Sequence, residues 1–465
     1  MHNTPPAATT ARALIDAAPL SRFQWQTFFL CFCVTLFDGF DTQAIAFTGP
    51  AIAGAFHLNP SQLTPLIVAG TLGMALGAIG LGSLGDRIGR RAAILVAVLI
   101  FALFSLATGF ARSPTEILLA RFFTGLGMGG AVPSVLSLVS ELSPARHRGL
   151  LITGALLGLP AGAIVGGLLT SSLLPMVGWQ GIYVIGGLAP LLFLPVLWFL
   201  LPESPFFLMA NDPTLHQQTI HNLLRKLLPA VSEKELLAST SHLPEKSTIA
   251  SVKALFHPDY LRNTLAVWLT YFCNWTAWFM LILWLPTALK TGGLPAAKAA
   301  QGTVMINTPA ILFCLVMAYY LPRQPVRRLL GFTLLFGLLV VTSLGVLSGL
   351  DSQPLGESTY WLSMFCLIGA AGVGIGLPQI ALNYVVLEAY PTALRATGSG
   401  WAIGMGRVGS ILGAALGGLL LTRLGVAGFY FFLILPLLCA ALGVWLIRTK
   451  APALARIPPR QSLSR

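Results

Sequence analysis

Residues 141–149 read ELSPARHRG, and residues 388–398 read EAYPTALRATG. Both stretches contain the pattern E-x-x-P-x-x-x-R, and the two copies begin 247 residues apart. A glycine-rich segment with a proline precedes each copy, GLGMGGAVP at 125–133 and GVGIGLP at 372–378. Because the pattern, the glycines and their order agree, we predict a chain built from two similar halves, an organisation typical of transporters.

The composition predicts where such a chain resides. Of its 465 residues 55% are hydrophobic and only 9% are charged, with a mean hydropathy of +0.80. Soluble domains carry about 25% charged residues, so lipid must cover much of this apolar surface. A bilayer admits only helices or closed barrels. The apolar runs are about 20 residues long and lack two-residue alternation, which favours helices.

Charged residues and Pro/Gly breaks divide the chain into twelve predicted spans. They lie near 24–50, 62–84, 92–111, 115–138, 149–171, 179–201, 263–289, 299–321, 327–349, 359–387, 395–421 and 425–447. We predict an all-α membrane protein with twelve transmembrane helices in two pseudo-symmetric six-helix bundles, at 24–201 and 263–447. Residues 1–23 and 448–465 are predicted cytoplasmic tails, and 202–262 a cytoplasmic linker with a few interfacial helices.

The net charge of +13 would fit a nucleic-acid partner, but its distribution does not. Most of the lysines and arginines fall in the termini and in alternate loops on one side. The few basic residues on the other side are Arg112, Lys290, Lys298 and Arg423. This positive-inside pattern predicts a multi-pass inner-membrane protein with both termini in the cytoplasm and no nucleic-acid partner. No apolar signal region precedes Phe23, so no cleaved signal peptide is expected.

Two acidic residues lie inside the first predicted span, in CVTLFDGFDTQAI at 33–45. Burying a carboxylate in a membrane helix costs roughly 2.5–3.5 kcal/mol on insertion scales, so such groups usually have a function. Asp38 and Asp41 are three residues apart and share a helix face. Two close carboxylates in a low dielectric do not both ionise readily. We predict a proton-coupling pair; the alternative is a structural ion pair with a neighbouring helix.

Several stretches carry a family resemblance. GSLGDRIGRR at 82–91 resembles the signature loop of the major facilitator superfamily. FDGFDTQA at 37–44 resembles the D-G-x-D motif of its aromatic acid:proton symporters. Residues 121–133 and 395–409 resemble that family's fourth and eleventh helices, although Ser134 stands where an asparagine commonly follows the proline. The resemblance extends over essentially residues 20–447.

The resemblance implies uptake of an aromatic carboxylate, such as a benzoate, hydroxybenzoate or phenylpropanoate, together with a proton. Such an anion needs a cation and apolar or aromatic walls. Arg121 and Arg407 are the arginines well inside predicted spans, one in each half, and either could hold a carboxylate bidentately. A structural role is the alternative for both. The other predicted substrate-binding residues are Gln43, Asn274, Trp278, Gln379, Asn383 and Trp401.

The signature loop and the repeated pattern are predicted to form a conformational switch. Asp86 can accept from a helix N-terminus or pair with an arginine. In the second half Pro322 stands where this aspartate would be, so any latch there must differ. The predicted switch residues are Gly85, Asp86, Arg87, Arg90, Glu141, Arg148, Glu388 and Arg395.

These observations predict a proton symporter that works by alternating access as a monomer in the lipid bilayer. A proton symporter for a sugar or a non-aromatic acid, and a drug/proton antiporter, remain as alternatives. The sequence offers no metal cluster, nucleotide loop or nucleophile–base pair, and its cysteines lack metal-site spacing. We therefore expect no enzymatic activity, no cofactor and no metal.

Overall fold

The computed structural model describes residues 11–211, 217–229, 231, 252–320, 326–350 and 356–447. These residues form helices and contain no strand. Residues 1–10 and 448–465 and, within the predicted linker, residues 212–216, 230 and 232–251 lie outside the described residues, so the predicted domain limits stay predictions.

The N-terminal half contains six long or paired helices. They are α2 (Arg22–Ala55), α3 (Pro60–Ile88), α4 (Arg90–Gly109), α5 (Pro114–Leu142), α6 (Arg148–Leu156) and α7 (Gly158–Leu200). Gly178 interrupts α7 with φ 65° and ψ −179°, a left-handed conformation that glycine adopts at no steric cost. Because of this break, α6 with the first part of α7 forms the fifth span, and the rest of α7 forms the sixth.

The C-terminal half repeats this plan. Its helices are α11 (Pro258–Thr291), α12 (Ala296–Ala299), α13 (Gln301–Tyr320), α14 (Val326–Gly349), α15 (Glu357–Ala371), the π-helical turn η3 (Gly372–Gly376), α16 (Leu377–Ala389), α17 (Thr392–Phe432) and α18 (Ile434–Leu446). Gly425 breaks α17 with φ 68° and ψ −170°, as Gly178 breaks α7.

Length and composition identify nine candidate membrane spans within the described residues. Two of these, Arg148–Leu200 and Thr397–Leu446, are 53 and 50 residues long and contain the two glycine breaks. A helix of about 20 residues already crosses the hydrocarbon core, so each long segment crosses twice. Counting each long segment twice and adding the apolar α13 to the nine candidates gives the twelve helices of two six-helix bundles. This confirms the predicted fold class.

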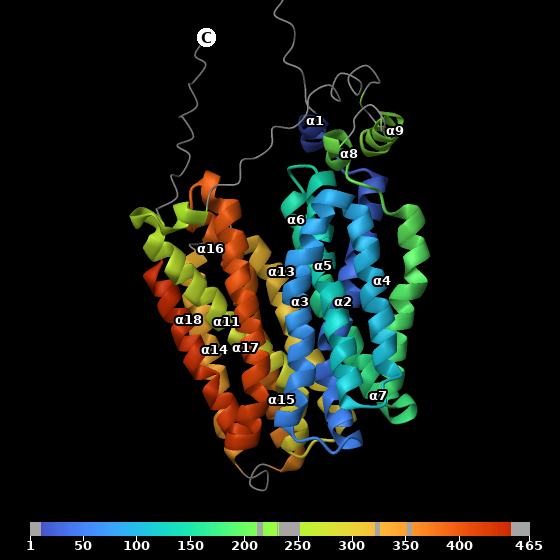
Figure 1. Ribbon diagram of the computed structural model, residues 1–465. Coiled ribbons are helices and arrows are strands. Elements are labelled where there is room, and N and C mark those ends of the chain that lie inside the picture. Colours follow the sequence, from blue (N-terminus) through green and yellow to red (C-terminus); the bar gives the residue numbers. More distant parts are fainter. Residues whose placement is uncertain are drawn as a thin grey trace, which may run out of the picture.

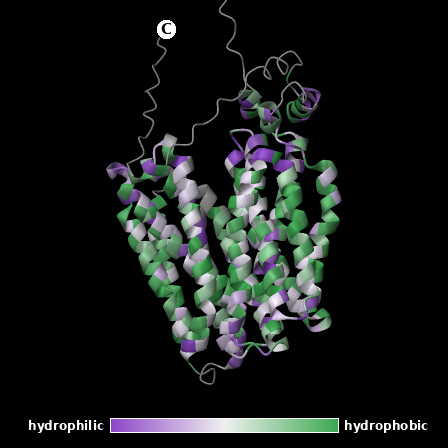
Figure 2. Cartoon of the chain, in the orientation of Figure 1, coloured by the Kyte–Doolittle hydropathy of each residue, from purple (hydrophilic) through white to green (hydrophobic). Residues whose placement is uncertain are grey.

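The two bundles stand side by side, the N-terminal one in blue to green and the C-terminal one in yellow to red (Figure 1). The short helices α1 (Ala11–Ala17), α8 (Pro205–Asn211) and α9 (Gln217–Leu227) lie together at one end, here called the linker face. The opposite end is called the far face. Hydrophilic residues gather at the helix ends and on α9, while the helix shafts are mostly hydrophobic (Figure 2).

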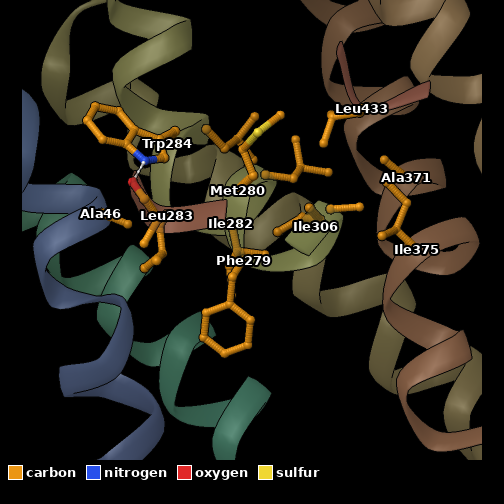
Figure 3. Close-up of a cluster of buried hydrophobic side chains, with 14 of the residues drawn as sticks. Ala46, Phe279, Met280, Ile282, Leu283, Trp284, Ile306, Ala371, Ile375 and Leu433 are labelled. Atoms are coloured by element: carbon orange, nitrogen blue, oxygen red, sulfur yellow. Dashed lines mark hydrogen bonds between the residues drawn. The ribbon is translucent and has the colours of Figure 1, made fainter. Parts of the chain in front are cut away.

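Contacts between the halves lie toward the far face, where α3 packs on α17, α2 on α11 and α7 on α13. The indole of Trp284 on α11 is fully buried there, and its Nε1 donates to the Ala414 carbonyl at 2.9 Å (Figure 3). Ala46 of α2 and Leu283 of α11 belong to the same buried cluster, which contains residues of both halves (Figure 3). The far ends of the two halves are therefore joined by a packed apolar contact.

Candidate substrate and proton site

Asp41 belongs to a closed polar network within the N-terminal half. Its side chain is 0% exposed, and its Oδ2 lies 2.7 Å from Nη1 of Arg121 on α5. Its Oδ1 accepts from Ser105 Oγ of α4 at 2.6 Å, and its backbone carbonyl accepts from Arg121 Nη2 at 2.8 Å. Both carboxylate oxygens are thus satisfied by neighbouring helices. In this conformation Asp41 and Arg121 neutralise each other inside one bundle.

Tyr183 of α7 completes this network. The Arg121 guanidinium lies 5.6 Å from the centre of the Tyr183 ring, a favourable cation–π distance. The Tyr183 hydroxyl accepts from Thr48 Oγ1 at 3.1 Å. Neither Tyr183 nor Ser105 was singled out from the sequence. Ser105, a hydroxyl in an apolar span, carries a weak signal; Tyr183 carries none.

Asp38, one helical turn away, has different surroundings. Its side chain is 1% exposed, and its Oδ1 accepts from Thr42 Oγ1 at 2.9 Å. Its Oδ2 is buried and has no hydrogen-bond partner among the described residues. A buried polar atom without a partner is uncommon in folded proteins and calls for an explanation. The electrostatic partners of this carboxylate are Asp41 and, from the other half, Arg407.

Arg407 on α17 presents an unpaired cation to the interface between the halves. Its guanidinium lies 5.4 Å from the centre of the Trp275 ring, and its Nε is buried without a partner among the residues that the structure describes. Among the described residues no carboxylate lies within ion-pair distance of it. A Cβ added at Gly406 would lie 2.8 Å from the Trp275 ring, so this glycine lets α17 approach the indole. An arginine with free donors can hold a carboxylate bidentately.

One face of α11 carries polar and aromatic side chains at helical spacing: Tyr271, Asn274, Trp275 and Trp278. The Tyr271 hydroxyl donates to Oδ1 of Asn383 on α16 at 3.1 Å. Asn274 is fully buried, and neither its Oδ1 nor its Nδ2 has a partner in the described part of the chain. This face of α11 therefore combines ring surfaces with unused amide groups, the composition of a small-molecule site.

The π-helical turn η3 precedes α16 and the next two candidate residues. A Cβ added at Gly376, the last residue of η3, would lie 2.8 Å from the Trp278 ring. Gln379 follows on α16, and its Nε2 is buried without a partner. Asn383 is exposed, and its Nδ2 lies 3.5 Å from the Gln379 carbonyl. Turns of π-helix occur often at functional sites.

The last two candidates lie elsewhere. Gln43 of α2 is buried, and its Oε1 accepts from Nδ2 of Asn307 on α13 at 3.3 Å, which joins the two halves. Trp401 is 45% exposed and stacks on Trp268 at 5.8 Å. The structure thus places Gln43 between the halves, and Trp401 beside Trp268 of α11.

The predicted switch residues of the N-terminal half form a network at the linker face. Arg90 pairs with Asp86 at 2.8 Å and with Glu141 at 3.2 Å, and its Nη1 donates to the Gly85 carbonyl at 2.7 Å. The backbone N–H of Arg90 donates to Glu203 Oε1 at 2.8 Å, so a carboxylate caps the N-terminus of α4. Glu203 was not among the predicted switch residues.

The switch network extends to α1. Glu141 also accepts from the Ser204 hydroxyl, and Arg148 pairs with Asp16 of α1. Asp16 pairs in turn with Arg12 at 3.3 Å. Asp16 was not selected from the sequence, because its partner in the switch network, Arg148, is 132 residues away.

The remaining predicted switch residues have fewer contacts. Arg87 is exposed. In the second half Arg395 Nε donates to the Tyr390 carbonyl at 3.2 Å, and Glu388 is partly buried near the end of α16. The turn at 321–325, with Pro322, lies outside the described residues. The functional roles predicted for these side chains and for the site residues stay predictions.

Comparison with known proteins places this architecture in a family. The family model described as "Major Facilitator Superfamily" matches residues 31–414. The chain belongs to the Major Facilitator Superfamily. It is 37% identical to the "Gallate transporter" of Pseudomonas putida over 434 residues, 92% of this chain and 93% of that protein. It is 35% identical to the "4-hydroxybenzoate transporter PcaK" of Pseudomonas aeruginosa, over 88% of this chain and 89% of that protein.

Solved structures of the superfamily share the fold. A partially occluded inward-open form of the xylose transporter XylE from E. coli matches with a TM-score of 0.72, over 91% of this chain and 98% of XylE. Its sequence identity is 17%, so this likeness concerns the fold alone. The relatives in sequence are transporters of aromatic acids, which confirms the resemblance to the aromatic acid:proton symporters of this superfamily.

Proposed function

We propose that this protein is a symporter that imports an aromatic carboxylate together with a proton. The relation between Asp38 and Arg407 carries the proposal. Asp38 of the N-terminal half has a buried carboxylate oxygen without a hydrogen-bond partner among the described residues. Arg407 of the C-terminal half has a guanidinium with no described carboxylate within ion-pair distance. A proton and a carboxylate would satisfy both groups. The names of the sequence relatives, a gallate and a 4-hydroxybenzoate transporter, support an aromatic acid as the anion.

In this proposal Asp38 binds the proton, and Arg407 and its neighbours bind the substrate. Asp38 Oδ2 takes the proton, which removes the negative charge that would repel the substrate. Arg407 then binds the substrate carboxylate through its free N–H donors, while Trp275 offers a ring surface. The unused amides of Asn274 and Gln379 suit hydroxyl groups on the aromatic ring. With one proton per monoanion, the step carries no net charge.

The orientation belongs to the same proposal. We place the linker face in the cytoplasm of a cell whose inner membrane the chain spans, because its basic loops obey the positive-inside pattern. With the far ends of the halves in contact, the described conformation is then closed to the outside. Import requires the two bundles to separate at the far face and close at the linker face, as in other repeat-built transporters. One chain contains both halves, so a monomer suffices.

Uptake into proteoliposomes tests the proposal. Purified protein is reconstituted, a pH gradient is imposed, acidic outside, and uptake of labelled 4-hydroxybenzoate is followed. We expect accumulation that collapses with a proton ionophore and that gallate and benzoate inhibit but xylose does not. Inhibition by xylose alone would point to a sugar symporter. Accumulation driven by the opposite gradient would point to an antiporter, and either result would overturn the proposal.

A further inference from the structure

A lysine joins the two halves at the far face. Lys290 stands at the end of α11, and its Nζ donates to the backbone carbonyl of Pro50 on α2 at 2.6 Å. The same Nζ lies 3.7 Å from where a Cβ on Gly54 would be, so α2 passes close beside it. Lys290 is otherwise exposed. The hydrogen bond therefore links α11 of one half to α2 of the other through the Lys290 ammonium.

The turn of α11 before Lys290 is also inserted between the halves. Thr287 is 5% exposed, its Oγ1 is buried without a partner, and this atom lies 3.8 Å from where a Cβ on Gly49 would be. One turn earlier, the fully buried Trp284 packs on Gly418 of α17, which also touches Thr64 at the start of α3. This end of α11 thus closes the far face. Among the described residues of this end, Lys290 is the last one that makes a hydrogen bond to the N-terminal half.

We propose that Lys290 is the latch of the far-face gate and that, once the gate opens, it captures the carboxylate of the incoming substrate. Pro50 and Lys290 belong to opposite halves, so opening at the far face must break their hydrogen bond. The ammonium is then left at the mouth of the pathway without its acceptor. A carboxylate is the acceptor that pairs best with it, because hydrogen bonds between ionised groups are the stronger ones.

The charge distribution supports this role. Few basic residues lie on the far side, and Lys298 is the one nearest in sequence. Lys298 is exposed and makes no hydrogen bond or ion pair with any described residue. It carries the same charge as Lys290 and lies on α12, which packs on α2, but its side chain makes no bond to α2 of the kind that Lys290 makes to Pro50. Lys298 is therefore a matched control that separates the latch from a general attraction of anions to the far face.

The inference rests on the proposed function. Its first test therefore measures only whether the far-face gate is open or closed, and it needs no substrate. A cysteine at Thr287 reports the gate, because this position is buried between the halves in the described form. A membrane-impermeant thiol reagent is added from the far side, and the parent protein that retains Thr287 gives the background labelling of the native cysteines, of which Cys366 is exposed. Relative to Thr287→Cys alone, we expect Lys290→Met to raise the labelling rate of that cysteine about tenfold, Lys290→Arg to keep it nearly the same and Lys298→Met to leave it unchanged.

The second test measures whether Lys290 contributes to binding of the incoming substrate. In reconstituted protein, Lys290→Met should raise the KM for 4-hydroxybenzoate at least fivefold, while Lys298→Met leaves it within twofold and Lys290→Arg restores most of the affinity. An unchanged labelling rate and an unchanged KM in Lys290→Met would overturn the inference. Equal effects of Lys290→Met and Lys298→Met would also overturn it, since charge alone would then suffice.

The two proposals fail in different ways. If the parent protein takes up no aromatic acid, the proposed function is wrong, whatever the labelling shows. If the parent transports and the gate reporter does not respond to Lys290→Met, only the latch is wrong. Size-exclusion profiles of every variant show whether the protein remains folded, and Lys290→Leu, which also removes the charge, replaces Lys290→Met if that variant is poorly expressed.

Discussion

Arg121 and Asp41 form an ion pair 2.7 Å long inside the N-terminal half, and their side chains are 1% and 0% exposed. Among the described residues, Asp38, one turn away, has an oxygen without a hydrogen-bond partner, and Arg407 in the other half has no carboxylate within ion-pair distance. The four charges therefore sort into a satisfied pair within one bundle and an unsatisfied pair between bundles. This division leads to different expectations for substitutions at neighbouring positions.

Asp41→Asn should destabilise the protein. The change leaves the buried Arg121 charge uncompensated, and breaking one side of a buried ion pair typically costs about 3–5 kcal/mol. Thermal unfolding in detergent measures the loss. The double variant Asp41→Leu/Arg121→Met removes both charges and should recover most of the stability. A melting temperature of Asp41→Asn equal to that of the wild type would contradict the network described for this pair.

Asp38→Asn should leave stability almost unchanged and uncouple transport. The amide oxygen can still accept from Thr42, but the side chain can no longer take up and release a proton. We expect accumulation driven by a pH gradient to disappear, while exchange of labelled for unlabelled substrate at equal pH continues. Both are measured in the same proteoliposomes. Normal gradient-driven accumulation by this variant would remove Asp38 from the proton pathway.

Arg407→Gln should weaken substrate binding more than it changes folding, because Arg407 has no ion-pair partner to lose among the described residues. Binding of 4-hydroxybenzoate should fall at least tenfold, a loss of about 1.4 kcal/mol or more. Arg407→Lys keeps the charge but not the planar pair of donors, and should give an intermediate affinity. The neutral amide of the same ligand is the control: the wild type should prefer the acid, and Arg407→Gln should not.

Gly409→Ala should disrupt the C-terminal half. A Cβ at this position would overlap the Phe272 carbonyl of α11, whose backbone cannot move without separating α11 from α17. A comparable Cβ at Gly404 on the same helix meets nothing within 4 Å. Gly404→Ala should therefore be tolerated and gain about 0.5–1 kcal/mol of helix propensity. Fluorescence-detected size-exclusion chromatography after heating compares the two, and equal heat resistance would refute the close packing of α11 on α17.

Hydropathy was sufficient to predict the helices, since lipid forces every backbone polar group into an internal hydrogen bond. The first predicted span, 24–50, is α2, which begins two residues earlier because Ser21 and Gln24 form a capping box. The predicted break between 171 and 179 lies at Gly178. Positions of this kind depend on local sequence, so they can be recognised without a structure.

The division of labour between the two aspartates could not be predicted. Their spacing places both on one helix face, and only the tertiary fold brings Ser105 and Arg121, 64 and 80 residues away, to Asp41 and not to Asp38. Lys290 was recognised only as one of the few basic residues on its side. Its acceptor is a backbone carbonyl 240 residues away. Every residue has a backbone carbonyl, so the sequence alone cannot identify this acceptor.

Gly178 and Gly425, which break α7 and α17 in the same left-handed conformation, are separated by 247 residues. The two E-x-x-P-x-x-x-R patterns have the same separation, so neither copy has gained or lost a residue between the pattern and the break. This is what an ancestral duplication and fusion would leave behind. At the same offset Arg407 corresponds to Pro160. The Arg407 guanidinium therefore has no counterpart in the N-terminal half, so the two halves share their backbone plan but not this charge.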